Sequence, residues 1–360
     1  MRVLFTSSLS YPPQDAGGSK ASTHALCLHL KEGGHEVALL CGLENNGWFG
    51  LWTRLRRKIS RRHNFPVDHL LHYPAYRGWS AADGMPEVSQ RFRPDIAVAD
   101  AGLTMLLAKA IIKEGIPTVV CIRDVEFDRM GGLPFADPML TYVANSDFTA
   151  SALRRQFGID SIVIPPLIYP EHYRVNSDRS HVLHINPHPV KGIDITLELA
   201  RRRPDIPFVI IEAWILSDTL LNKYRGMASK LPNVIWKERT SDMRKVYQHA
   251  RIVLAPSQWD EAWGRIATEP HVSGIPVIAS ARGGLPESVG PGGLLVDPAA
   301  PIDAWLEALS ALWDNPQEYE RRAAAASQYS RRPEIQPAYL LNKFANILQD
   351  HIKVTTALRQ

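Results

Sequence analysis

Short apolar runs alternate with amphipathic stretches along most of the chain, and this pattern predicts alternating strands and helices. Strands are predicted over 2–7, 35–41, 95–100, 117–122, 140–144, 161–164, 181–185, 207–213, 233–236, 251–255, 275–279 and 294–296. Helices are predicted over 19–32, 103–113, 193–202, 265–273, 302–313, 317–329 and 335–352, and Ser146 is the expected N-cap of a further helix. Strands that alternate with helices are typical of α/β domains with parallel sheets.

A break near the middle of the sequence predicts two domains. Pro165-Pro166 and the polar stretch 170–180 have the composition of a linker. A chain of 360 residues also favours two domains over one. We therefore expect a first Rossmann-like domain over 1–168, a second over 169–335, and a C-terminal helix within 336–360.

Composition excludes several classes of protein and leaves a globular one. Hydrophobic residues make up 45% and charged residues 22% of the chain, and no long apolar run predicts a membrane span. The start, MRVLFTSS, turns polar too soon for a signal peptide, so a cytoplasmic location is expected. The three cysteines have no zinc-ligand spacing and suit buried positions in a reducing compartment.

The segment 48–63, WFGLWTRLRRKISRRH, combines tryptophans with six basic residues and no acidic one. Trp48, Trp52, Leu55 and Ile59 recur at helical spacing, which predicts a basic amphipathic helix. Such a helix suits an anionic membrane surface, and the protein would then lie peripherally at the inner face of the membrane. An acidic glycan, a lipid-diphosphate acceptor, or simple packing with a solvated basic face are the alternatives. Nucleic acid is not expected, because no nucleic-acid-binding motif accompanies the segment.

The stretch 256–271, PSQWDEAWGRIATEPH, contains the strongest candidate chemistry. Glu261 lies in a loop ahead of the predicted helix, and Glu269 lies about one turn inside it. Gly264 lets a ligand approach the backbone, and the start of a helix favours an anion. Carboxylates accept hydrogen bonds from hydroxyl groups. An anion site between two carboxylates that can bind hydroxyls matches a nucleoside diphosphate sugar, whose diphosphate lies between a ribose and a hexose.

Together with SGIPVIAS at 273–280 and GGLPE at 283–287, this stretch resembles the retaining glycosyltransferases of family 4. Two glutamates at this spacing are common, but the ordered set PS, E-x(7)-E, AWG, GIPVIAS and GGLPE is specific. The resemblance implies an α/β fold of the GT-B type, with two Rossmann-like doubly wound domains facing across a cleft. The first domain would bind the acceptor, the second would bind the nucleotide sugar, and the final helix would cross back to the first domain.

The resemblance also implies a role for each candidate residue. Glu261 would hold hydroxyls of the donor sugar, Glu269 would hold the ribose, and Lys191 would stabilise the departing diphosphate. Further candidate contacts of the donor are Gly17, Gly18, Asn186, His188, Trp263, Gly264 and Arg265. Arg123 and Asp124 are candidates beside the donor sugar and the acceptor. The family needs no bound metal and no cofactor beyond the donor, and retention is ascribed to front-face attack.

Two positions depart from the family pattern. Arg123 stands where a histidine is common; an arginine can bind a phosphate bidentately or pair with Asp124 or Glu126, but it cannot act as a base. Asn186 stands where the motif G-R-x(4)-K-G has its arginine, so a phosphate contact would have to come from His188 or Arg265.

Three functions therefore stay open at this point. The first is a retaining glycosyltransferase acting on a glycan, a lipid-linked or a small-molecule acceptor. The second is a partner subunit that binds a nucleotide sugar without transferring it, which the two departures motivate. The third is a GT-B nucleotide-sugar epimerase. An NAD-type dehydrogenase fits less well, because the turn at Gly17-Gly18 lacks the full glycine fingerprint.

Overall fold

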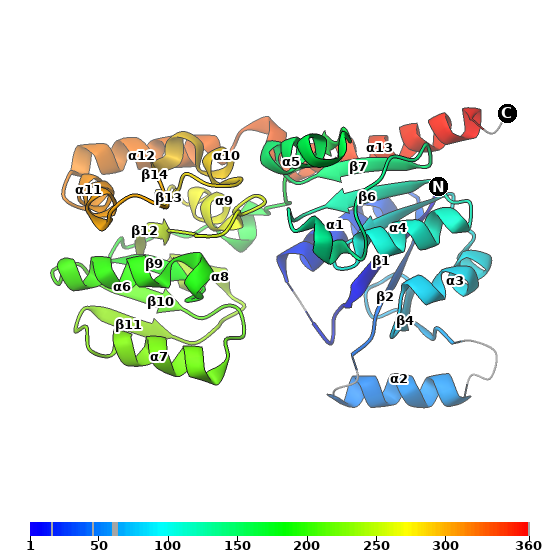
Figure 1. Ribbon diagram of the computed structural model, residues 1–360, viewed down its shortest axis with the longest axis horizontal. Coiled ribbons are helices and arrows are strands. Elements are labelled where there is room, and N and C mark those ends of the chain that lie inside the picture. Colours follow the sequence, from blue (N-terminus) through cyan, green and yellow to red (C-terminus); the bar gives the residue numbers. More distant parts are fainter. Residues whose placement is uncertain (16, 45–46, 60–63, 359–360) are drawn as a thin grey trace. The chain divides into compact units, whose positions relative to one another are not determined.

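The computed structural model describes residues 1–15, 17–44, 47–59 and 64–358, with the backbone alone described at 56–59. The chain divides into two compact units: unit 1 is Met1–Pro166 with Ala338–Gln360, and unit 2 is Leu167–Pro337. Each unit is a mainly parallel α/β sheet with helices on its faces (Figure 1). The predicted pair of Rossmann-like α/β sheets is confirmed.

Unit 1 holds an eight-stranded sheet among its described residues, in the order β3-β4-β2-β1-β5-β6-β7-β8. The strands are β1 (Arg2–Ser10), β2 (Glu36–Gly42), β3 (Val67–Asp68), β4 (Ala75–Gly78), β5 (Ile96–Asp100), β6 (Thr118–Ile122), β7 (Leu140–Ala144) and β8 (Ile162–Val163). The helices are α1 (Gly18–Glu32), α2 (Gly47–Ile59), α3 (Met85–Phe92), α4 (Thr104–Lys113), α5 (Asp147–Phe157) and most of α13 (Pro337–Ala357). The strand β3 pairs antiparallel with β4, and the other described pairs are parallel.

Unit 2 holds a six-stranded parallel sheet in the order β11-β10-β9-β12-β13-β14 within the described part of the chain. The strands are β9 (His181–Ile185), β10 (Phe208–Ile211), β11 (Val234–Lys237), β12 (Ala250–Ala255), β13 (Val277–Ser280) and β14 (Gly293–Val296). The helices are α6 (Ile193–Arg202), α7 (Asp218–Ala228), α8 (Met243–Tyr247), α9 (Arg265–His271), α10 (Leu285–Val289), α11 (Ile302–Trp313) and α12 (Pro316–Tyr329).

The strand order reverses beside the first strand of each sheet. The strand β1 lies between β2 and β5, and β9 lies between β10 and β12. Where the strand order reverses, the connections that follow two neighbouring strands run to opposite faces of the sheet. This leaves a crevice at the carboxyl ends of those strands, and ligands of open α/β sheets bind there. In unit 2 this point lies after β9 and β12, and in unit 1 it lies after β1 and β5.

Elements with a long, clear pattern lie where the sequence predicts them. The bounds of α6 and α11 match the prediction, and the Oγ atom of Ser146 accepts a hydrogen bond from the Thr149 N–H at 2.9 Å, which confirms this residue as an N-cap. The central strands β5 and β6 are buried at every residue, which is why apart from Asp100 and Thr118 their residues are apolar. The short elements β3, β4 and α3 have no such pattern and were not predicted.

The C-terminal helix α13 packs on the sheet of unit 1. The two ring nitrogens of His351 lie 2.9 Å from the carbonyl oxygen of Met139, just before β7, and 2.8 Å from the hydroxyl of Thr141, within β7. The Lys343 ammonium donates to the Val163 carbonyl at 2.9 Å, and the ring of Phe344 stacks on Phe5 of β1. The chain therefore begins and ends in the same unit.

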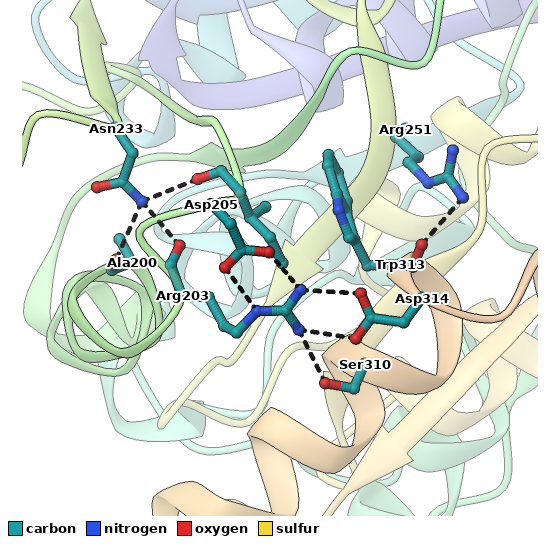
Figure 2. A network of polar contacts seen from close by, with 9 residues as sticks. Ala200, Arg203, Asp205, Asn233, Arg251, Ser310, Trp313 and Asp314 are labelled. Carbon is teal, nitrogen blue, oxygen red and sulfur yellow. Dashed lines mark hydrogen bonds and ion pairs between the residues drawn. The ribbon is translucent and has the colours of Figure 1, made fainter.

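A polar network closes the end of α6 in unit 2 (Figure 2). The Asn233 amide donates to the carbonyls of Ala200, Arg203 and Ile206 at 3.0, 3.0 and 2.8 Å. The Arg203 guanidinium bridges Asp205 and Asp314. Ala200 and Ile206 are buried, so their carbonyls depend on Asn233 for a partner at this point.

We predict that Asn233→Ala lowers the free energy of unfolding of unit 2 by about 1–3 kcal/mol, because buried acceptors lose their donor. Asn233→Asp should cost more, because a carboxylate would face three carbonyl oxygens. Asn222→Ala, an exposed asparagine on α7, is the matched control and should change stability by about 0.5 kcal/mol or less. Equal urea midpoints for the Asn233 and Asn222 variants would contradict the capping role.

Buried histidines make the stability of unit 2 sensitive to acid. Burial lowers the pKa of His181 and His184 to about 4 and that of His271 to about 3. In the unfolded chain the same side chains take up protons near pH 6.5. Between pH 6.5 and pH 4 the unfolded state therefore binds more protons, so stability is complete above pH 6.5 and falls as the pH is lowered through this range.

We predict that the melting temperature of the protein falls between pH 7 and pH 5, with His184 contributing on the order of 2 kcal/mol. His184→Gln should flatten this pH dependence, whatever it does to stability at pH 7. His69→Gln, at an exposed histidine of unit 1, should leave the slope unchanged. An unaltered slope in the His184 variant would show that this ring does not set the acid sensitivity.

Candidate functional site

The topology of unit 2 brings Lys191 to Glu261. The turn that carries Lys191 follows β9, and the loop that carries Glu261 follows the neighbouring strand β12. The two segments are joined by the backbone, since the Gln258 N–H donates to the Val190 carbonyl at 2.8 Å. The Lys191 ammonium then donates to Oε1 of Glu261 at 2.5 Å, with both side chains mostly buried.

Three further side chains surround this ion pair. The hydroxyl of Ser257 lies 3.1 Å from the same Glu261 oxygen, Oε1. The Lys191 ammonium lies 4.5 Å from the ring centre of Trp214 and 5.8 Å from that of Trp259. A carboxylate and two aromatic faces therefore hold the cation. An ammonium has three N–H donors and a carboxylate has about four acceptor positions, so both groups retain capacity for a ligand.

The glycine pair at 283–284 explains why the GGLPE turn accompanies the Glu261 loop. The Gly284 N–H donates to the Glu261 carbonyl at 2.6 Å. A Cβ atom at Gly283 would lie 2.5 Å from the Glu261 carbonyl oxygen, and one at Gly284 would lie 2.6 Å from that of Ala262. Any side chain at these positions would displace the loop that carries the carboxylate.

Glu269 is the centre of a second, buried polar cluster. Its Oε1 accepts from Nε of Arg265 at 2.9 Å, one turn earlier on α9, and its Oε2 accepts from the Tyr247 hydroxyl at 2.9 Å. Burial and the charge of Glu269 raise the pKa of Tyr247 well above its usual value, so this phenol stays protonated as a donor. The hydroxyl of Tyr173 accepts from Nη2 of Arg265 at 2.7 Å.

The structure directs the Arg265 guanidinium into this cluster. It donates to Glu269, to the Tyr173 hydroxyl and to the Leu167 carbonyl, whereas the sequence interpretation offered it as a phosphate contact. The helix also ends at His271 rather than at residue 273, so α9 has only seven residues.

The sequence AWG at 262–264 determines the backbone conformation before α9 and does not offer a side chain to a ligand. The indole of Trp263 is only 3% exposed and donates to the Thr268 hydroxyl at 2.9 Å, so a ligand cannot reach it directly, contrary to our expectation of a donor contact. Gly264 has a positive φ of 97°, and a Cβ atom there would lie 2.6 Å from the side chain of Leu285. Only glycine suits this position.

Asn186 and His188 shape the turn ahead of Lys191. Asn186 is buried with a φ of 73°, and its Oδ1 has no partner among the residues that the structure describes. Nδ1 of His188 accepts from the Val190 N–H at 3.2 Å, and its ring meets Trp214 edge-on. The Asn186 carbonyl lies 3.2 Å from Nε2 of His184, which ties the turn to the buried end of β9.

A cavity of about 490 Å³ opens beside the Glu269 cluster, with Tyr173 in its wall. Its lining residues are Glu171, His172, Tyr173, Ser241, Asp242, Met243 and Arg244. Because Tyr173 contacts Arg265, the cavity and the buried carboxylate share one polar network.

In unit 1, Arg123 pairs with Asp100, and not with either acidic residue that the sequence suggested. Its Nε and Nη2 atoms donate to the two carboxylate oxygens of Asp100 at 2.6 and 3.1 Å. Asp100 ends β5, Arg123 follows the neighbouring β6, and Thr23 of α1 also donates to Asp100. Asp124 accepts from the adjacent Val125 N–H.

The backbone at Gly17, just before α1, does not require a glycine. Gly17 is extended, with a φ of 177°, and a Cβ atom there would meet no other atom within 4 Å. Gly18 is the first residue of α1. Nearby, the hydroxyl of Tyr11 is buried without a partner among the described residues. Burial and the charge of Asp100 raise the pKa of this tyrosine well above its usual value.

The predicted site residues thus fall into separate groups. Lys191 and Glu261 meet, Arg265 meets Glu269, and Arg123 belongs to unit 1. The sequence interpretation missed the residues that hold them, namely Ser257, Tyr173, Tyr247, Trp214, Trp259, Asp100 and Thr23. Of these, Ser257 and Trp259 lie within the stretch 256–271 that carried the resemblance. The described residues contain no cluster of three or more His, Cys, Asp or Glu side chains suited to a metal ion.

Comparison with known proteins assigns both units to glycosyltransferase families. Residues 16–172 match the family described as Glycosyltransferase Family 4, and residues 182–329 match Glycosyl transferases group 1. A D-inositol 3-phosphate glycosyltransferase of Corynebacterium aurimucosum is 31% identical over 195 residues, which are 51% of this chain and 42% of that protein. The enzyme of the same name from Corynebacterium glutamicum is 42% identical over 93 residues, 25% of this chain and 22% of that protein. The matches thus span less than half of these relatives.

Among solved structures, HepE of Anabaena in complex with UDP and glucose is similar over 97% of this chain and 99% of its own, with a TM-score of 0.74 and 16% identity. This likeness concerns the fold. Because the two family matches cover most of both units, the chain belongs to the family 4 type of glycosyltransferases, with the GT-B fold.

Proposed function

We propose that this chain moves a hexose from a nucleoside diphosphate sugar to an acceptor hydroxyl, with retention of configuration. The observation that carries the proposal is the ion pair of Lys191 and Glu261 at the carboxyl ends of β9 and β12, where ligands of open α/β sheets bind. The structures of HepE with UDP and with UDP-glucose support a donor of this class.

In this proposal Lys191 binds the diphosphate of the donor and Glu261 binds its sugar. The free N–H donors of Lys191 would bind the diphosphate and stabilise the negative charge that develops as the sugar–phosphate bond breaks. Glu261, held in place by Ser257 and the backbone of Gly284, would accept hydrogen bonds from hydroxyls of the sugar. The departing phosphate would take the proton of the acceptor hydroxyl, so this scheme requires neither a protein nucleophile nor a metal ion.

Glu269 would hold the ribose of the donor. Two donors, Arg265 and Tyr247, each engage one of its oxygens, which orients the carboxylate and leaves acceptor positions for hydroxyls. The cavity beside Tyr173 has room for part of a nucleoside. Arg265 then acts by positioning Glu269 and not by binding phosphate.

Unit 1 would bind the acceptor near the end of β5. Because Asp100 engages Arg123 through two hydrogen bonds, the pair has no net charge and presents both donors and acceptors. This arrangement suits hydroxyl groups of a glycan, a lipid-linked sugar or a small molecule better than a phosphate. We place the protein in the cytoplasm, with peripheral association at the inner face of the membrane.

A screen of nucleoside diphosphates and their sugars tests the proposal most directly. A true donor should raise the melting temperature by mass action, with or without a chelator of divalent metals. Incubation with acceptor sugars and analysis of the products then separates the three functions. Transfer or hydrolysis indicates a transferase, an altered nucleotide sugar without free nucleotide indicates an epimerase, and binding without turnover indicates a partner subunit.

We predict that Lys191→Ala lowers turnover by about 10²- to 10³-fold, with a smaller effect on donor affinity, because it removes a group that stabilises the departing charge. Lys191→Arg should retain part of the activity. Lys230→Ala, an exposed lysine of the same unit, serves as the control. Turnover within twofold of the wild type in the Lys191→Ala variant would exclude the phosphate role.

For Glu269 we predict a loss of discrimination between ribose and its deoxy analogues. The wild-type protein should bind a nucleoside diphosphate about tenfold more tightly than the 2′,3′-dideoxy form, equivalent to about 1.4 kcal/mol for lost hydrogen bonds to a carboxylate. Glu269→Ala should bind both forms equally. Tyr247→Phe should reduce the preference in part, and Tyr339→Phe, at an exposed tyrosine, should keep it. Calorimetry that finds the full preference in Glu269→Ala would disprove the ribose role.

A further inference from the structure

The helix α2 presents apolar side chains to solvent along one side. Trp48, Leu51 and Leu55 are 73%, 61% and 57% exposed, and Trp52 lies in the same stripe at 40%. These positions follow the spacing i, i+3, i+4 and i+7, which places them on one face of a helix. The sequence prediction extended this stripe to Ile59 and the basic segment to residue 63, but the side chains of 56–59 and all of 60–63 lie outside the described residues.

The opposite side of α2 is fixed to unit 1. Phe49 and Thr53 are buried, and the ring of Phe49 lies 5.1 Å from the guanidinium carbon of Arg77 in β4. Arg77 is itself buried and held by Asp68 at 2.6 Å and the Pro12 carbonyl at 2.8 Å. The helix is therefore anchored on one face, and this anchor turns the Trp48–Leu55 stripe toward solvent.

This orientation is the reverse of an ordinary surface helix, which turns polar residues outward. An exposed apolar stripe does not fit a helix that packs its apolar face on its own domain, which was the alternative to a docking role. Complete burial of one leucine or tryptophan would contribute about 1.5–3 kcal/mol, which the free protein does not gain here. A continuous exposed apolar stripe of this kind marks a surface that another molecule covers.

The positive charge of the segment 48–63 indicates what kind of molecule covers the stripe. Residues 48–63 contain Arg54, Arg56, Arg57, Lys58, Arg61 and Arg62 and no acidic residue. The guanidinium of Arg54 lies 5.9 Å from the ring of Trp79, an exposed tryptophan just after β4 that adds to the apolar surface. A second copy of the chain is disfavoured, because a twofold interface would set the same basic segment against itself.

We propose that α2, together with Trp79, docks the protein on an anionic lipid bilayer. The stripe of Trp48, Leu51, Trp52 and Leu55 would enter the boundary between headgroups and acyl chains, where tryptophan is favoured. The positive charge that the sequence assigns to residues 48–63 would attract anionic headgroups, with about 1 kcal/mol for each basic residue that comes near the surface. Docking supplies the surface for the peripheral association proposed above, and because it rests on α2 and not on the donor site, it stands or fails independently of the proposed sugar transfer.

The test uses the full chain and vesicles of phosphatidylcholine, with or without about one third phosphatidylglycerol. We expect flotation with the anionic vesicles, a blue shift of tryptophan fluorescence, and weaker binding at high salt. The variant Trp48→Ser, Leu51→Ser, Leu55→Ser should partition at least about tenfold more weakly, because three apolar groups lose their burial. The control Leu70→Ser, Leu133→Ser, Leu358→Ser removes three exposed leucines elsewhere and should bind like the wild type.

Three outcomes would overturn the proposal. The first is absence of wild-type binding to the anionic vesicles, and the second is equal binding by the stripe variant. The third is that the wild-type protein self-associates in sedimentation velocity, the stripe variant does not, and neither protein binds lipid. An unchanged melting temperature and unchanged nucleotide binding in the stripe variant would show that it is folded, so lost partitioning would then report on docking alone.

Discussion

The contact between Lys191 and Glu261 depends on the adjacency of β9 and β12, two strands that are far apart in sequence. Parallel strands deliver their following loops to one edge of the sheet, and reversal of the strand order beside β9 leaves room above them. Backbone hydrogen bonds from Gln258 to Val190 and from Gly284 to Glu261 then hold the two loops together. Other features of this site, including the faces of Trp214 and Trp259, are arranged around the resulting ion pair.

Both units have an ion pair between residues at the carboxyl ends of two neighbouring strands. Unit 1 pairs Arg123 with Asp100 across β5 and β6, and unit 2 pairs Lys191 with Glu261 across β9 and β12. In both, a partly buried cation is kept in position by a carboxylate before any ligand arrives, which limits the desolvation penalty of each charge. The two ion pairs differ in geometry. The Arg123 guanidinium is held by two hydrogen bonds and can reorient less than the Lys191 ammonium, which donates one to Glu261.

The helix α2 shows how an anchor can leave an unfavourable surface exposed. Arg77 holds Phe49 on the inner side, and the spacing of the helix then fixes Trp48, Leu51 and Leu55 on the outer side. The periodicity of 48–63 predicted an amphipathic helix but could not say which face would be solvated. That depends on where the buried arginine of β4 lies, which is a property of the folded unit.

The sequence by itself determined the α/β class, the positions of long elements such as α6 and α11, and the motif that contains Glu261 and Glu269. These follow from local periodicity and from residues close together in the chain. Only the tertiary structure decided that Arg265 faces Glu269, that Trp263 is buried, and that Arg123 pairs with Asp100. A side chain's partner depends on its rotamer and on which distant strands become neighbours, and neither is encoded in the spacing of residues along the chain.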